Sequence, residues 1–226
     1  MSNQQRGTST LGSTIAEVNT DGSRRVAAYG PDIGASGGRF RSYSRTTAST
    51  AIAAIDGTNG ILWACRFTTA TTGKLALVER LIITATSTVG PTVAQETGVQ
   101  AFRATTFTAI PTAGTALTLT TPNAKLRSSL AVPEMLITVE NTTSELTAGT
   151  HTLDTLPLGA ETAWHLAAGA TVQMPTVKLD LDFRDSPLVL ANNEGILAGP
   201  AVTQANSLAQ VHRFTLVWRE VLNYPQ

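Results

Sequence analysis

Cysteine is nearly absent from this chain, and that scarcity removes two classes of small-protein architecture. The single Cys65 cannot form an internal disulfide, and it leaves a cysteine-based zinc site short of ligands. Cys65 alternates with Trp63 and Phe67 in a short apolar run, the pattern of one buried strand face. We therefore expect an unreactive thiol in the core.

Net charge and long apolar runs are lacking as well. The 16 basic side chains balance the 16 acidic ones, so the chain has no overall attraction to nucleic acid or to an anionic membrane, and we expect neither as a partner. No apolar run approaches the ~20 residues that cross a bilayer. The first residues lack the apolar core of a secretory signal. We expect a protein that stays in the cytoplasm where it is made until it joins an assembly.

Threonine, in contrast, is abundant at 37 copies, and it favours strands and turns over helices. From residue 60 onward, short apolar runs alternate with turn residues, and the runs at 178–183 and 212–220 show the period of two residues of a half-buried strand. This predicts an all-β fold, a β-sandwich or jelly-roll-like domain over residues 59–226. The expected strands are 61–67, 74–86, 92–108, 116–120, 135–140, 151–153, 172–183, 188–191 and 211–221.

One short helix is expected within this β domain. At 160–168, Glu161, Trp164 and Leu166 stand among alanines, which favour helix. The segment ends at Gly169, a residue that commonly follows a helix.

Residues 1–58 differ in texture, because Gly, Ser, Thr and Ala dominate and no hydrophobic period persists. We expect an extended N-terminal arm that becomes ordered against a partner, with arginines pairing to carboxylates and aromatic rings filling pockets. A solvated tail without a partner is the alternative. The predicted partner-binding residues are Arg24, Arg25, Arg39, Phe40, Arg41, Tyr43 and Arg45.

The sequence offers no catalytic motif. His151, His165 and His212 are far apart and lack the spacing of a zinc hydrolase, and neither a serine nucleophile elbow nor a phosphate-binding loop is present. We therefore expect a protein that is not an enzyme and that uses no cofactor and no metal. An inward-facing cluster of histidine and carboxylate would favour the opposing hypothesis, an enzyme on a cupin-like or lyase-like β-fold.

Two groups of charged residues need a structural interpretation. Asp180, Asp182 and Asp185 could offer oxygen ligands to calcium. However, the first two alternate with leucines, so we expect them on an outward strand face, neutralised by nearby basic residues, Lys178 and Arg184. Glu79 and Arg80 interrupt an otherwise apolar strand and are expected to point to opposite faces.

Four stretches carry a resemblance to a known group of proteins: LRSS at 126–129, LTAGTHTLD at 146–154, SPLVLANNEG at 186–195 and FTLVWREV at 214–221. Their order resembles that in virion structural proteins of tailed bacteriophages, over residues 60–222. The resemblance implies a capsid decoration or cement protein on the virion surface, whose partners are the major capsid protein and copies of itself in a homotrimer. A tail or connector element and a receptor- or glycan-binding virion protein stay open as alternatives. No catalytic residues come with the resemblance.

Overall fold

The computed structural model describes residues 17–18, 24–25, 38–119, 132–142, 144–167, 175–205 and 207–222. All regular structure in these ranges is β, which confirms the predicted fold class, and none of it is a helix that could span a membrane. The strands are β1 (Glu17–Val18), β2 (Arg24–Arg25), β3 (Gly38–Arg45), β4 (Ser49–Thr50), β5 (Trp63–Phe67), β6 (Lys74–Val89), β7 (Gln95–Ala109), β8 (Thr115–Ala116), β9 (Met135–Val139), β10 (Thr150–Leu153), β11 (Gly159–His165), β12 (Thr176–Asp182), β13 (Leu188–Leu190), β14 (Glu194–Pro200) and β15 (Ala209–Leu222).

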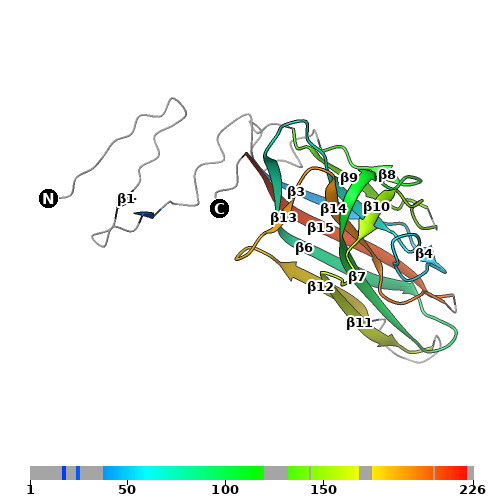
Figure 1. Cartoon of the computed structure of the whole chain (residues 1–226). Helices are drawn as coiled ribbons and strands as arrows, with labels where there is room; N and C mark the ends of the chain where they lie inside the picture. The colour runs from blue at the N-terminus through cyan, green and yellow to red at the C-terminus, as the bar shows by residue number, and fades with distance from the viewer. Residues whose placement is uncertain are drawn as a thin grey trace.

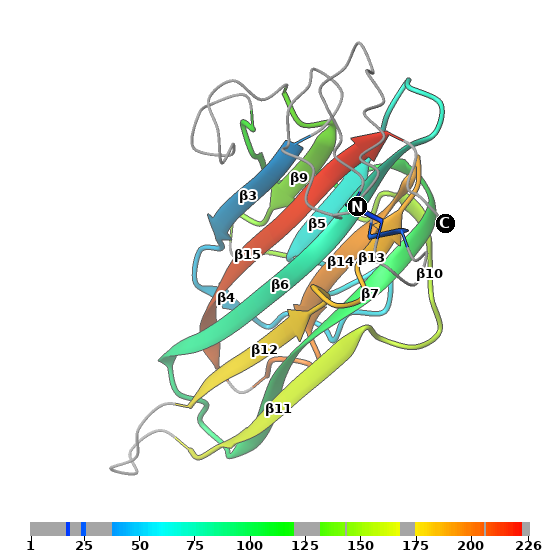
Figure 2. The ribbon, with the colours of Figure 1, turned by 90° about the vertical axis from the view of Figure 1, so that its left-hand side faces the viewer.

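Two antiparallel sheets pack against each other as a β-sandwich (Figure 1). The first, which we name the β15 sheet, has the strand order β12-β6-β15-β3, and β13 and β4 pair with β6 and β15. The second, the β14 sheet, has the order β10-β7-β14-β5-β9-β8, and β11 also pairs with β7. Figure 2 looks onto the β15 sheet, with β3 along one edge and β12 along the other.

The two sheets enclose one apolar core. Trp63 of β5 stacks on Phe214 of β15 across the sandwich, with ring centroids 5.5 Å apart. Cys65, the next inward residue of β5, is fully buried. Burial raises the pKa of its thiol to about 12, so the thiol is protonated at neutral pH. The expected core thiol is therefore confirmed.

A second apolar cluster covers part of the outer face of the β14 sheet. Phe107 of β7 and Leu197 of β14 point into it, while Ile55, Ile61 and Leu146 come from the segments that lead into and out of the strands. The Leu146 N–H donates to the Ile61 carbonyl at 2.8 Å and ties two of these segments together. The outer face of this sheet is therefore buried under loops of the same chain around Phe107 and Leu197, whereas Leu136 of β9 and Trp164 of β11 remain exposed.

The helix predicted at 160–168 is wrong over its described part. All seven residues of β11 pair with β7, from Gly159 opposite Ala101 to His165 opposite Gln95. Alanine favours helix in isolation, but propensity is a weak preference that the ladder of backbone hydrogen bonds to β7 overrides. Residue 168 lies outside the described residues.

The sandwich also takes in the last part of the predicted arm. β3 pairs with β15 from Arg45 opposite Arg213 to Gly38 opposite Glu220. Further along, Ile52 is buried in the core between the sheets. Residues 38–58 therefore belong to the domain and not to an arm. Of the rest of the predicted arm, only β1 and β2 lie within the described residues.

Candidate interaction surface

The outward side chains of the β15 sheet reach solvent at its β3 edge, unlike those of β7 and β14 that lie in the second apolar cluster. Arg41, Tyr43 and Arg45 of β3 are exposed, and Tyr43 is 61% exposed. Arg213 lies beside them on β15, directly opposite Arg45. We name these four residues the arginine face.

A β-bulge in β6 turns two neighbouring charged residues to this same side of the sheet. The pairing of β6 with β15 skips one position, because Val217 lies opposite Arg80 whereas Trp218 lies opposite Val78. Glu79 is the extra residue, and an extra residue breaks the alternation of faces. Glu79 and Arg80 therefore both reach the outer face, and the prediction that they point to opposite faces is wrong.

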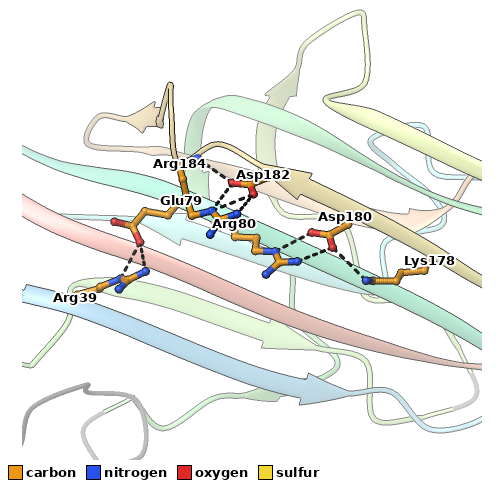
Figure 3. Close-up of polar contacts among 7 residues, drawn as sticks. All are labelled: Arg39, Glu79, Arg80, Lys178, Asp180, Asp182 and Arg184. Atoms are coloured by element: carbon orange, nitrogen blue, oxygen red, sulfur yellow. Dashed lines mark hydrogen bonds and ion pairs between the residues drawn. The ribbon is translucent and has the colours of Figure 1, made fainter.

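Glu79 binds two arginines on the outer face. Its carboxylate accepts a hydrogen bond from Arg39 Nε of β3 at 2.8 Å (Figure 3). It accepts another from Arg219 of β15. The Glu79 side chain is only 3% exposed. One buried carboxylate thus joins β6, β15 and β3 by charge-assisted hydrogen bonds.

The acidic residues of β12 are also paired with cations. Arg80 donates to both oxygens of Asp180, at 2.8 and 2.7 Å, and Lys178 Nζ lies 3.1 Å from the same carboxylate. Hydrogen bonds from Arg80 lower the pKa of Asp180 to about 2, and hydrogen bonds from Arg184 do the same for Asp182. The expected neutralisation by Lys178 and Arg184 is confirmed, with Arg80 as a further partner. Within the described ranges, no group of three or more His, Cys, Asp or Glu could hold a metal ion.

The positive charge of the arginine face, in contrast, is not balanced. In the described part of the chain, Arg41 and Arg45 have no carboxylate partner, and Arg213 donates only to Thr86 Oγ1 at 3.0 Å. Arg45 and Arg213 lie directly opposite each other, an arrangement of like charges that destabilises a sheet. The folded protein therefore holds repelling cations beside the exposed ring of Tyr43. Arginine and tyrosine are the residue types enriched at protein interfaces and at their energetic centres.

The structure separates the seven residues predicted to bind a partner. The outward side of β3 brings together Arg39, Arg41, Tyr43 and Arg45. Phe40 instead points inward, is 1% exposed and packs on Trp218 with ring centroids 5.5 Å apart, so it belongs to the core. Arg24 and Arg25 form β2, which pairs with β1, and their side chains lie outside the described residues.

Sequence reasoning missed two arginines of this side of the sheet, Arg213 and Arg219. Their alternation with buried aromatic residues marks them as outward, but nothing in the sequence places β15 beside β3. The strand pattern of β3 is itself weak, because its inward positions include Gly38, Ser42 and Ser44, which are also typical of irregular segments.

The histidines do not assemble into a site in the described ranges. His212 is fully buried, neither ring nitrogen has a hydrogen-bond partner, and burial lowers its pKa to about 4. Burial also lowers the pKa of His151, whose ring lies 5.3 Å from that of Phe107. His165 Nδ1 lies 3.0 Å from the backbone oxygen of Leu166. The inward-facing histidine–carboxylate cluster that would favour an enzyme is not found among these residues.

Comparisons with known proteins identify no family for the chain. No family model matches it, and no curated protein matches it significantly. The resemblance to phage virion proteins therefore stays a prediction, and what the structure establishes is an all-β sandwich with one arginine-lined outer edge.

Proposed function

We propose that the protein is a non-enzymatic structural component of a phage virion, a capsid decoration or cement protein that bridges major capsid proteins. The observation that supports this most directly is the arginine face, where Arg41 and Arg45 have no carboxylate partner among the described residues and lie beside the exposed Tyr43 on β3. The sequence resemblance supports a phage particle as the place where the protein acts, and the arginine face supports a way for it to attach there.

The architecture suits a permanent attachment. The face is built on strands held in a ladder, so binding orders few groups beyond the arginine side chains. Tyr43 adds contact area with few rotatable bonds, which keeps the entropy loss on binding small. Arg41 and Arg45 can each bind a carboxylate through two parallel hydrogen bonds. The capsid protein should therefore offer acidic side chains at the site of contact.

Co-sedimentation tests the proposal. The full chain is mixed with purified phage heads that lack it, and the bound protein is quantified after centrifugation. Hundreds of bound copies per head would agree with decoration. A dozen or fewer would favour a connector or tail element, and binding to sugars on a glycan array without binding to heads would favour a receptor-binding protein.

Two matched variants test the face itself. Arg41→Glu on β3 and Lys178→Glu on β12 reverse one exposed charge each on the same sheet, at opposite edges. We expect Arg41→Glu to abolish sedimentation with heads and Lys178→Glu to retain most of it. Equal binding by the two variants would show that the arginine face is not the attachment site.

A further inference from the structure

In the part of the chain that the structure describes, one side of β3 has no partner strand, because β3 pairs with β15 alone. The Thr46 N–H donates to the His212 carbonyl at 2.9 Å, just beyond the end of β3. Because hydrogen-bonded pairs alternate along an antiparallel ladder, Ser44 and Ser42 also turn their backbone groups to β15. The backbone N–H and C=O groups of the intervening residues point to the open edge: Arg39, Arg41, Tyr43 and Arg45.

These same residues direct their side chains to the outer face. A strand added to this edge would form hydrogen bonds with the backbone of Arg41, Tyr43 and Arg45. Its residues directly opposite them would have their side chains on the same face, with Cβ atoms about 5 Å away. The β3 edge therefore offers an added strand both backbone hydrogen bonds and side-chain contacts, from the same residues.

We propose that β3 is a docking edge for an extended segment of the partner protein, which adds to the β15 sheet as a further strand. The segment carries acidic residues at two positions four apart, opposite Arg41 and Arg45, and an apolar or aromatic residue midway, opposite Tyr43. The identity of the partner as a capsid protein rests on the proposed function, whereas the mode of binding rests on β3 alone.

The charges of β3 also argue against a second copy of β3 as the occupant. In an antiparallel pair of two β3 strands centred on Tyr43, Arg41 of each copy would lie opposite Arg45 of the other. Like charges directly opposite each other are destabilising, and charged edge positions are a common protection against edge-to-edge pairing. The same arginines therefore disfavour self-pairing and favour an acidic strand.

Peptide binding tests this inference. The probe is a fluorescein-labelled nine-residue peptide of threonine and valine with glutamate at positions 3 and 7 and leucine at position 5. The control peptide has lysine at positions 3 and 7. Fluorescence anisotropy with the full chain should show binding of the glutamate peptide at least about tenfold tighter than that of the lysine peptide, with affinity falling as salt is added.

Two substitutions separate strand addition from simple charge attraction. Tyr43→Ala removes the ring and keeps the outward N–H, whereas Tyr43→Pro also removes that N–H. Because this N–H points away from β15, Tyr43→Pro leaves the ladder to β15 intact, which a thermal unfolding curve of each variant checks. We expect Tyr43→Pro to bind the glutamate peptide about tenfold more weakly than Tyr43→Ala does. Hydrogen exchange of the Arg41 and Tyr43 amides should slow when the peptide binds.

The outcomes distinguish this inference from the proposed function. Equal affinity of the two Tyr43 variants, or amide exchange unchanged by the peptide, would overturn strand addition. If heads bind the protein through Arg41 but the glutamate peptide does not bind, the edge inference fails and the proposed function stands. If the peptide binds as expected but heads do not bind, the edge inference stands and the virion role fails.

Discussion

The β14 sheet has part of its outer face, around Phe107 and Leu197, under loops, while the β15 sheet leaves its β3 edge in solvent, although both sheets are built from antiparallel strands. On the β14 sheet the outward positions include Phe107 and Leu197, which need a cover. On the β15 sheet the corresponding positions hold Arg41, Arg45 and Arg213, which water solvates. The residues at the outward positions, and not the strand pattern, decide which part of an outer face the chain buries and which part it leaves in solvent.

The largest expected difference comes from truncating one aromatic residue on each face. Phe107→Ala on the covered face should destabilise the protein by about 3–5 kcal/mol, because it leaves a cavity in the second apolar cluster. Tyr43→Ala on the open face should change stability by no more than about 0.5 kcal/mol. Urea unfolding followed by tryptophan fluorescence measures both. Equal losses would mean that Tyr43 is part of the fold and not of a binding surface.

The stability of the protein should depend on pH through His212, a fully buried residue of β15. Its pKa is lowered from 6.5 to about 4 by burial, so the unfolded chain binds a proton there at a higher pH than the folded protein does. The resulting stability is complete above pH 6.5 and is lost as the pH falls toward 4, by about 3 kcal/mol at ~1.4 kcal/mol per pKa unit. Burial raises the pKa of Glu140, which acts in the opposite sense.

The variant His212→Leu isolates this contribution. The unfolding free energy of the wild type should fall by about 3 kcal/mol relative to that of the variant as the pH is lowered from 6.5 to 4, because only the wild type has His212 to protonate. Parallel curves for the two proteins over this range would contradict the assignment.

A smaller effect is expected from Glu79, the buried carboxylate of the open sheet. Glu79→Gln removes the negative charge that Arg39 and Arg219 share, and we expect a loss of about 1–3 kcal/mol. The arginines can turn to water, since the Arg39 side chain is 42% exposed, which keeps the loss below that of a fully buried pair. Unchanged stability in urea would mean that the bulge, and not the carboxylate, sets the local structure.

The smallest effect is expected at the other edge of the open sheet. Asp180→Asn breaks the pair with Arg80, whose side chain is 37% exposed, so the loss should not exceed about 1 kcal/mol. The loss should shrink further in high salt, because screening weakens exposed ion pairs. A loss of stability as large as that of Glu79→Gln would mean that the ion pair at the β12 edge of the β15 sheet matters as much as the buried carboxylate on β6.

The sequence predicts the parts of this fold in which outward and inward residues differ sharply in polarity. In the strand around Cys65 and in the final strand, aromatic residues occupy inward positions and arginines mark the outward side, so their faces follow from spacing. β3 could not be recognised in this way, because small inward residues hide its period. The shared face of Glu79 and Arg80 depends on a bulge, which is a property of the pairing with β15 and not of β6 itself.

The same limit applies to the candidate site. The arginines and Tyr43 could be singled out from the sequence, because they stand out in a segment composed mainly of Gly, Ser, Thr and Ala. Phe40 could not be separated from Tyr43, since the two differ only in which face of an unrecognised strand they occupy. The role of Arg213 depends on its position opposite Arg45, a contact between residues far apart in the chain.

That separation along the chain has a consequence for biosynthesis. β3 emerges early from the ribosome, but it has no strand to pair with until β15, at residues 209–222, has been made. Such long-range pairing forms late in folding, because the chain loses the entropy of closing a long loop before the contacts between the two strands stabilise it. A chain interrupted before β15 therefore lacks the strand that orders β3.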